Sequence, residues 1–447
     1  MPRKDGAQQT RSIASGKSRY GGDRTRAGAP AGAPGPGLPA RRRPFGFSEF
    51  FGSFECFESF ENGVAAMSRS SGSESGPEPS SEPRVESGTE DEPESGTEAG
   101  PEVVVWDTTY ACPLRCSHCY SESGRRPSRQ LSPPDMLRVA DALLSLGPRV
   151  VALSGGEPLI VQGIFEVAAR LRDAGVKMSV NTSGWVMNRA LAERLADHFD
   201  EVIVSLDGAT PEVHDRIRGR AGSFDRVMAA LALLDEVAQE RLAAGRKRLV
   251  FGIDCVVIRS NFGQLEDFAA DIAHRFPRLR SLAFNSAVPE GLASRREFCR
   301  RELLDDAQVA RLTGAEQLAR LRELAPASVS VFTTDNFNLV MNPERVSRRV
   351  DTLVMQVEPD GRVRGIPVYE GTVGSLLEEP AALLWKRTLA RLSDPFVVET
   401  LSSVHSMQTW AEAVRRMDLH FGSREDLARI ARRSVRTDPP EFAALMR

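Results

Sequence analysis

The residues with the most specific chemistry are three cysteines that lie within eight residues of one another. Cys112, Cys116 and Cys119 follow the spacing C-x3-C-x2-C inside the segment DTTYACPLRCSHCY. Three thiolates on one short loop can bind three irons of a [4Fe–4S] cube, which takes soft sulfur ligands. The fourth iron then has no protein ligand, which suits direct binding of a cofactor or substrate better than simple electron transfer. The spacing therefore predicts one [4Fe–4S] cluster.

Two alternatives exist for the same residues. A zinc ion could take the three thiolates together with His118, but the adjacent pair His118 and Cys119 fits a single tetrahedron poorly. The three cysteines could also be buried thiols without a ligand. The motifs that follow along the chain favour the iron–sulfur interpretation.

Composition excludes several classes of protein. The chain has 447 residues, a formal net charge of −3, 41% hydrophobic and 27% charged residues. A near-neutral charge argues against a dedicated nucleic-acid binder, and no run of about 18 apolar residues is present to span a membrane. Six cysteines are too few for a disulfide-dense secreted scaffold. We expect a cytoplasmic protein with two or three domains.

Residues 1–101 are predicted to be a disordered leader. Residues 1–45 hold ten Lys or Arg against two Asp or Glu, and residues 68–100 hold nine Asp or Glu against two Arg. Neither stretch can bury enough apolar surface to offset chain entropy. Met67 precedes the acidic stretch and is a candidate start, in which case residues 1–66 would be translated upstream DNA.

Short apolar runs that alternate with helical patterns follow the leader. This alternation predicts parallel βα units and an α/β fold: a partial (β/α)6 barrel resembling a TIM barrel, with ligands bound beyond the C-terminal ends of its strands. We assign residues 102–325 to this core. The expected strands are 103–106, 149–153, 177–181, 201–206, 249–258 and 280–285, and the expected helices are 132 onward, 163–174, 188–198, 223–244 and 261–275.

Residues 326–447 are predicted to form a small α+β C-terminal domain. Leu353–Val357 and Arg362–Ile366 flank a Glu-Pro-Asp-Gly turn, which is typical of a β-hairpin. Helical segments follow at 375–392 and after residue 409. Because the hairpin alternates apolar residues, we expect this domain to pack over the mouth of the barrel.

Several motifs fall at the ends of the expected strands, and together they resemble the radical S-adenosylmethionine superfamily over residues 102–290. Ser154-Gly155-Gly156-Glu157-Pro158 is similar to the GGE motif of that family, and Asn181-Thr182-Ser183-Gly184 is similar to its TNG-type turn. Ser205-Leu206-Asp207-Gly208 and His214-Asp215-Arg216-Ile217-Arg218 resemble the SLDG and HDxxR pair of its peptide-modifying members.

The resemblance implies cofactor contacts at these positions. Glu157, beside Gly155 and Gly156, would hold the methionine amino group, and Ser205 and Arg218 would hold the carboxylate and nearby polar groups. His118 would lie near the adenine. The motif match adds Asn181 and Asp207 as cofactor-binding residues.

The resemblance also implies a reaction. A reduced cluster cleaves S-adenosylmethionine to a 5′-deoxyadenosyl radical, which abstracts hydrogen from the substrate, and a reductant such as flavodoxin or ferredoxin supplies the electron. The expected substrate is a peptide or a peptide-like natural product. The alternative is a dehydrogenase, epimerase or lyase that acts on a sugar, an aminocyclitol or another small metabolite. A non-enzymatic iron–sulfur scaffold is the third hypothesis, and the intact motifs argue against it.

The C-terminal domain resembles the SPASM or twitch extension of radical S-adenosylmethionine maturases, with one departure. Ile366 stands where that extension has a cysteine, and no cysteine follows Cys299. We therefore expect no auxiliary cluster. Cys255 is a candidate hydrogen donor to a product radical, and its structural alternative is a small buried hydrophobic residue.

Overall fold

The computed structural model of the chain describes residues 100–348 and 353–433. The predicted disorder of the leader and the alternative start at Met67 concern residues outside this described part. Within it, no helix is long and apolar enough to cross a membrane.

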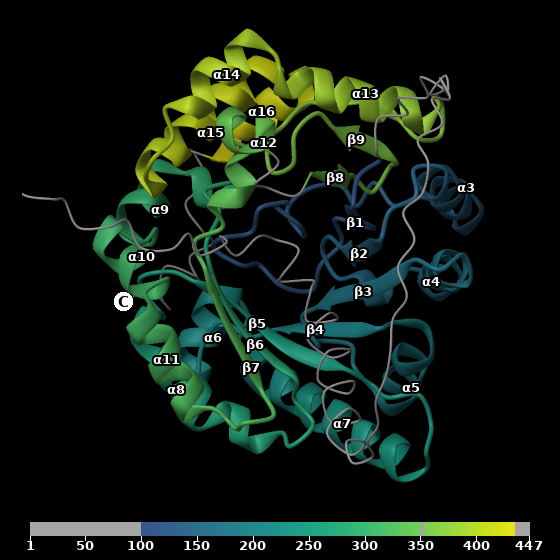
Figure 1. Ribbon diagram of the computed structural model, residues 1–447, viewed down its shortest axis with the longest axis vertical. Coiled ribbons are helices and arrows are strands. Elements are labelled where there is room, and N and C mark those ends of the chain that lie inside the picture. The colour runs from purple at the N-terminus through teal and green to yellow at the C-terminus, as the bar shows by residue number, and fades with distance from the viewer. Residues whose placement is uncertain (1–99, 349–352, 434–447) are drawn as a thin grey trace, which may run out of the picture. The chain divides into compact units, whose positions relative to one another are not determined.

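Ten strands form one curved sheet in the order β10-β9-β8-β1-β2-β3-β4-β5-β6-β7 (Figure 1). The run from β8 through β1 to β7 is parallel throughout, whereas β9 and β10 are antiparallel additions at one end. The strands are β1 (Val103–Asp107), β2 (Val150–Ser154), β3 (Lys177–Thr182), β4 (Glu201–Ser205), β5 (Phe251–Val257), β6 (Ser281–Ser286), β7 (Ser330–Thr334), β8 (Val354–Val357), β9 (Arg362–Arg364) and β10 (Thr372–Ser375).

The predicted α/β fold class with a parallel sheet is confirmed, and all six expected strands form. Two further parallel strands extend it, because β7 pairs with β6 and β8 pairs with β1. The predicted boundary after residue 325 therefore falls inside one continuous sheet. The hairpin strand that we expected to pack over the barrel is instead hydrogen-bonded into its wall.

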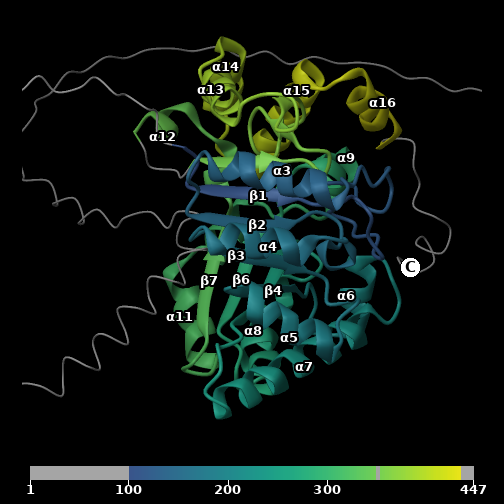
Figure 2. The ribbon, with the colours of Figure 1, turned by 90° about the vertical axis from the view of Figure 1, so that its right-hand side faces the viewer.

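Helices of the core lie on the outer face of the sheet (Figures 1 and 2). Their apolar sides pack with the strands into one large core that includes Trp106, Met178 and Phe284. Most follow the expected pattern, with a Ser132 cap and prolines at the start of the first of them. The helices are α3 (Pro133–Leu144), α4 (Ile164–Asp173), α5 (Arg189–His198), α6 (Pro211–Arg218), α7 (Ser223–Ala243), α8 (Leu265–Ala270), α9 (Arg296–Arg301), α10 (Asp306–Leu312) and α11 (Ala315–Leu324).

The C-terminal helices gather at one end of the sheet, above β1 in Figure 2. They enclose a second core in which Ile366, Tyr369 and Trp410 are buried. Ile366, at the position where a cysteine is expected, thus packs among apolar side chains. The helices are α12 (Pro343–Ser347), α13 (Ala381–Leu392), α14 (Pro395–Ser402), α15 (Met407–Phe421) and α16 (Arg424–Arg433).

Buried ion pairs also join this end of the chain to the barrel. Arg433 lies 2.7 Å from Glu122 on the loop after β1, and Arg429 pairs with the same carboxylate and lies 2.6 Å from Glu370. Arg364 of β9 lies 2.6 Å from Glu290. We call these six residues, with Asp418 beside Arg433, the tail ion network. Charge pairing thus holds this part of the chain together with the packing of its second core.

Candidate active site

The cysteine loop, residues 108–124, leaves the C-terminal end of β1 without regular secondary structure. The backbone carbonyls of such a loop have no hydrogen-bond donors from a helix or sheet, and four arginine side chains donate to them. Every carbonyl from residue 112 to residue 117 accepts a hydrogen bond from a guanidinium, at distances of 2.6–3.3 Å. The donors are Arg115, Arg125, Arg220 and Arg295. An irregular loop held at each peptide unit keeps its thiols in place.

Helix α6 fixes the same loop from one side. Its last residues present carbonyls that no helical N–H can reach, because the helix stops at Gly219 with a φ of 67°. Two of these carbonyls accept hydrogen bonds from the cysteine loop, Arg218 from the N–H of Arg115 at 3.0 Å and Ile217 from the N–H of Ser117 at 2.8 Å. The HDxxR segment therefore positions the cysteines through its backbone.

Gly155 and Gly156 pack against the loop from the other side. A Cβ at Gly156 would lie 2.1 Å from the carbonyl oxygen of Ala111, and one at Gly155 would lie 2.5 Å from that of Thr109. The backbone N–H of Gly156 donates to Thr109 at 2.7 Å. In the structure these glycines let the end of β2 approach the cysteine loop closely, and their part in cofactor binding stays a prediction.

Replacing Gly156 with alanine is expected to reduce the amount of iron that the protein retains after anaerobic reconstitution. The new methyl group cannot fit against Ala111, so the loop that carries Cys112 must move. Iron and protein assays on Gly156→Ala measure this directly. Gly263→Ala is the matched control, because no atom lies within 4 Å of a Cβ at that position. Equal iron content in both variants would contradict the packing role.

Asp207 lies at the centre of a buried charge cluster beside the loop. Its carboxylate is 2.6 Å from Nε of Arg218 and 2.8 Å from Nε2 of His118. Burial alone raises the pKa of Asp207, but the charges of Arg218 and His118 outweigh it and hold that pKa below its usual range. Burial and the nearby Arg218 lower the pKa of His214 to about 4, so this imidazole is neutral and accepts the backbone N–H of Asp207.

Arg218 also reaches the cysteines, since its Nη1 lies 3.8 Å from the sulfur of Cys116. Its guanidinium is buried, so its ion pair with Asp207 is not a surface contact. The family resemblance implied a contact with a cofactor carboxylate. That contact stays a prediction, and in the structure the guanidinium bridges Asp207 and the thiol of Cys116.

Glu157 joins the ends of β2 and β3. Its buried carboxylate accepts hydrogen bonds from Thr182 Oγ1 at 2.8 Å and from the backbone N–H of Ser183 at 3.0 Å. Burial raises its pKa above the usual value in spite of these bonds. Asn181, one residue earlier, lines the cavity described below, and Ser205 ends β4 opposite Asp254 of β5.

The two remaining cysteines of the described chain lie away from the loop. Cys255 is fully buried in the core between the sheet and the helices, while its neighbours Asp254 and Val256 line the cavity on the opposite face of β5. Cys255 therefore does not face a substrate in this cavity. The alternative given above, a small buried hydrophobic residue, describes it better. Cys299 is buried too, and its thiol donates to the carbonyl of Ala293 at 3.3 Å.

The three thiols of the loop fit an iron–sulfur cluster better than a zinc ion. In the described residues no three His, Cys, Asp or Glu side chains converge as one metal ion requires, and His118 is hydrogen-bonded to Asp207. A cube makes no such demand, because each thiolate binds a different iron. Burial raises the pKa of Cys116 to about 11 and raises that of Cys112 further, so metal ligation must displace their protons.

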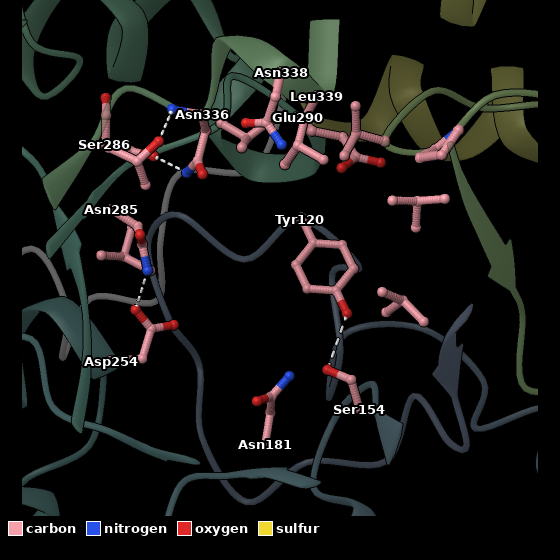
Figure 3. Close-up of a pocket in the computed structure, with 18 of the residues that line it drawn as sticks. Tyr120, Ser154, Asn181, Asp254, Asn285, Ser286, Glu290, Asn336, Asn338 and Leu339 are labelled. Carbon is pink, nitrogen blue, oxygen red and sulfur yellow. Dashed lines mark hydrogen bonds between the residues drawn. The ribbon is translucent and has the colours of Figure 1, made fainter. Parts of the chain in front are cut away.

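A cavity of about 270 Å³ opens beside the loop at the C-terminal ends of the strands (Figure 3). His118 and Tyr120 of the loop form part of its wall, and Asp254, Asn285 and Glu290 form another part. Ser154, Asn181, Gln356 and Val368 also line it, so the cavity is bounded by the barrel, the loop and the C-terminal part of the chain together.

Buried carboxyls line or support this cavity. Tyr120 donates to Asp107 at 2.5 Å, and burial raises the pKa of Asp107 to about 6. Asn285 donates to Asp254, whose pKa burial raises to about 7. The sequence did not mark Tyr120 or Asn285 as site residues. The available hints were that Tyr120 directly follows Cys119 and that Asn285 lies at the end of an expected strand.

The cysteine loop, the glycine pair and the ends of β2 to β4 all lie within one segment that matches a known sequence family. Residues 106–252 match the family model described as the radical SAM superfamily. This segment belongs to the radical SAM superfamily. The radical SAM segment contains every cofactor-binding residue that the sequence predicted, whereas Asp254, Asn285 and Glu290 lie beyond it.

Several curated proteins are similar to this chain in sequence. The chain is 35% identical over 240 residues to mycofactocin maturase MftC of Mycobacterium ulcerans, which covers 53% of this chain and 58% of that protein. It is 35% identical over 136 residues to the AdoMet-dependent heme synthase of Methanosarcina barkeri, which covers 30% of this chain and 39% of that protein. The chain thus spans about half the length of these curated relatives.

A solved structure shares the fold. The crystal structure of Streptococcus suis SuiB bound to S-adenosylmethionine aligns with a TM-score of 0.51 over 68% of each chain, at 16% identity. At this identity the likeness concerns the fold alone, and it agrees with the curved parallel sheet described above.

Proposed function

We propose that the chain is an enzyme that cleaves S-adenosylmethionine at one [4Fe–4S] cluster and modifies a peptide with the resulting radical. The observation that carries this proposal is the placement of Cys112, Cys116 and Cys119 on one clamped loop at the edge of a cavity. When bound, such a cluster supplies the electron that splits S-adenosylmethionine into methionine and a 5′-deoxyadenosyl radical.

The residues around the loop would set the conditions for this chemistry. The arginine side chains hold the loop backbone, and Arg218 places a positive charge beside Cys116, which favours a thiolate there. The barrel and Pro367 and Val368 of the C-terminal part together wall the cavity, which would shield a reactive radical from part of the solvent.

Residues of the cavity wall are the proposed contacts of S-adenosylmethionine. His118 and Asn181 line the cavity and are proposed to contact S-adenosylmethionine, with Glu157, Ser205 and Arg218 as the further binding residues implied by the family resemblance. Glu157 already accepts three donors from its surroundings besides Ser183 Oγ, so binding of an ammonium group would add to this set rather than fill an empty one.

A peptide substrate is supported by the maturase among the relatives. A sugar, an aminocyclitol or another small metabolite remains the alternative prediction. A reductant such as flavodoxin or ferredoxin is proposed as the electron source, and a cytoplasmic location remains a prediction.

The test is release of 5′-deoxyadenosine. The anaerobically reconstituted full-length protein, mixed with dithionite and S-adenosylmethionine, should release it slowly even without a substrate. Cys119→Ala should release none, while Cys299→Ala, which changes another buried thiol, should match the wild type. Mass spectrometry of the quenched mixture gives the answer. No release from iron-loaded wild-type protein, or equal release from Cys119→Ala, would overturn the proposal.

A further inference from the structure

Four side-chain hydrogen-bond donors around the cavity are already engaged with the protein. The side-chain amide of Asn285 donates to Asp254, and that of Asn336 donates to the carbonyl of Ser286 at 2.7 Å. The amide of Gln356 and the hydroxyl of Tyr120 both donate to Asp107, which lies behind the wall. These four donors are therefore committed before any ligand arrives.

Two acceptors of the same wall have no partner. Oδ1 of Asn285 and Oε2 of Glu290 accept no hydrogen bond. Both residues are buried, since Asn285 is 8% exposed and Glu290 is not exposed at all. Asn285 is labelled in Figure 3 beside Asp254, with its amide nitrogen turned toward that carboxylate. When Asp254 is ionised, this contact fixes the orientation of the amide, because the reverse would bring its carbonyl oxygen against a carboxylate. A buried acceptor without a donor is costly, so a ligand group is expected to fill it.

The acidic residues of the lining also favour a ligand group that donates hydrogen bonds. Asp254 and Glu290 contribute carboxyl groups to the wall, and among the described residues that line the cavity there is no lysine or arginine. Arg364 neutralises part of Glu290 from behind, through Oε1 at 2.6 Å, and leaves Oε2 unpaired. Because burial raises the pKa of Asp254, a cation bound beside its carboxyl group would also offset the cost of ionising it.

We propose that Asp254 and Asn285 recognise a cationic nitrogen group of the substrate, the ammonium of a lysine side chain or the guanidinium of an arginine side chain. Both groups carry several N–H donors and a positive charge, and so match open acceptors in an acidic wall. The inference rests on the proposed function, because it names the kind of peptide side chain that the same cavity takes.

The experiment measures binding of three small probes to the full-length, cluster-loaded protein under anaerobic conditions. The probes are the N-acetyl amides of lysine, arginine and the neutral analogue norleucine, and saturating S-adenosylmethionine is present throughout. Ligand-detected NMR titrations give the dissociation constants. We expect the lysine or the arginine probe to bind about 10- to 100-fold more tightly than the norleucine probe, as for a hydrogen bond to a charged group. The comparison of lysine with arginine identifies the favoured cation.

Two variants locate the site. Asp254→Asn keeps the shape of the side chain and should remove most of this preference, and Asn285→Ala, which deletes the open acceptor, should weaken it. Asp141→Asn, the same change at an exposed carboxylate of α3, should keep it. Because Asn285→Ala also removes the hydrogen bond to Asp254, the conclusion is drawn from Asp254→Asn when Asn285→Ala unfolds.

Three outcomes would overturn the inference. They are no preference for the cationic probes, a preference that Asp254→Asn leaves intact, and a preference that disappears when S-adenosylmethionine is added. The last outcome would assign the acceptors to the cofactor's own ammonium group. Failure of the proposed function is separate, because it would show as absent 5′-deoxyadenosine release while the cation preference persists.

Discussion

Alanine in place of Cys116 is expected to reduce the iron bound by the reconstituted protein from about four atoms per chain to almost none. The same loss is expected for Cys112→Ala and Cys119→Ala. A cube held by three thiolates on one loop loses its anchoring when any of them is missing, since no other cysteine of the described chain is near enough to replace it. Iron and sulfide assays together with the visible absorption spectrum measure the result.

The matched controls are Cys255→Ala and Cys299→Ala. Both change buried thiols, and both leave the loop untouched, so their iron content should equal that of the wild type. Iron that survives in Cys116→Ala would refute the cluster assignment. So would zinc as the only metal in the wild-type protein, or about eight irons per chain, which would require a second cluster.

Loss of Arg429 is expected to destabilise the protein by about 3–5 kcal/mol, as when one member of a buried charge network is removed. Arg429 of α16 pairs with both Glu122 and Glu370, and its removal as Arg429→Met leaves these buried carboxylates with less positive charge. The charge of Arg429 also helps to keep the pKa of Glu370 low. Urea denaturation followed by circular dichroism measures the change in unfolding free energy.

Arg320→Met is the comparison for this variant. Arg320 of α11 forms exposed ion pairs with Glu323 of the same helix and Glu266 of α8, and solvent screens such pairs, so its loss should change the stability little. If both variants lower the stability equally, the tail ion network has no special role in joining α16 to the barrel.

Sequence patterns predicted the parts of the fold that depend on local information. The six core strands follow from short apolar runs, and the cysteine loop follows from a motif of eight residues. β7 was missed because Ser330–Thr334 is short and partly exposed, so it lacks a strong apolar pattern. The pairing of β8 with β1 was missed because strand neighbours are decided by tertiary contacts, which the hairpin signal does not contain.

In the candidate site, too, local motifs were predictable and tertiary contacts were not. The cysteines and the glycine pair were recognisable as motifs, but the partners of those residues were not. Helix α16 is the clearest case, because its charged residues would normally be assigned to a solvated face. In the structure Asp426, Arg429 and Arg433 form the buried face, since their partners come from Glu122 and Glu370, far away in the chain.

The pairing of β1 with β8 has a consequence for the order of folding. Val103 is the register partner of Val354, roughly 250 residues later, so one edge of β1 stays open until that part of the chain has been synthesised. Contacts of such sequence separation form late, and an open strand edge can pair with other chains in the meantime. The strand that carries the cysteine loop is therefore among the last to be completed. Truncation before β8 should leave a chain that aggregates, even though residues 106–252 with all three cysteines would be intact.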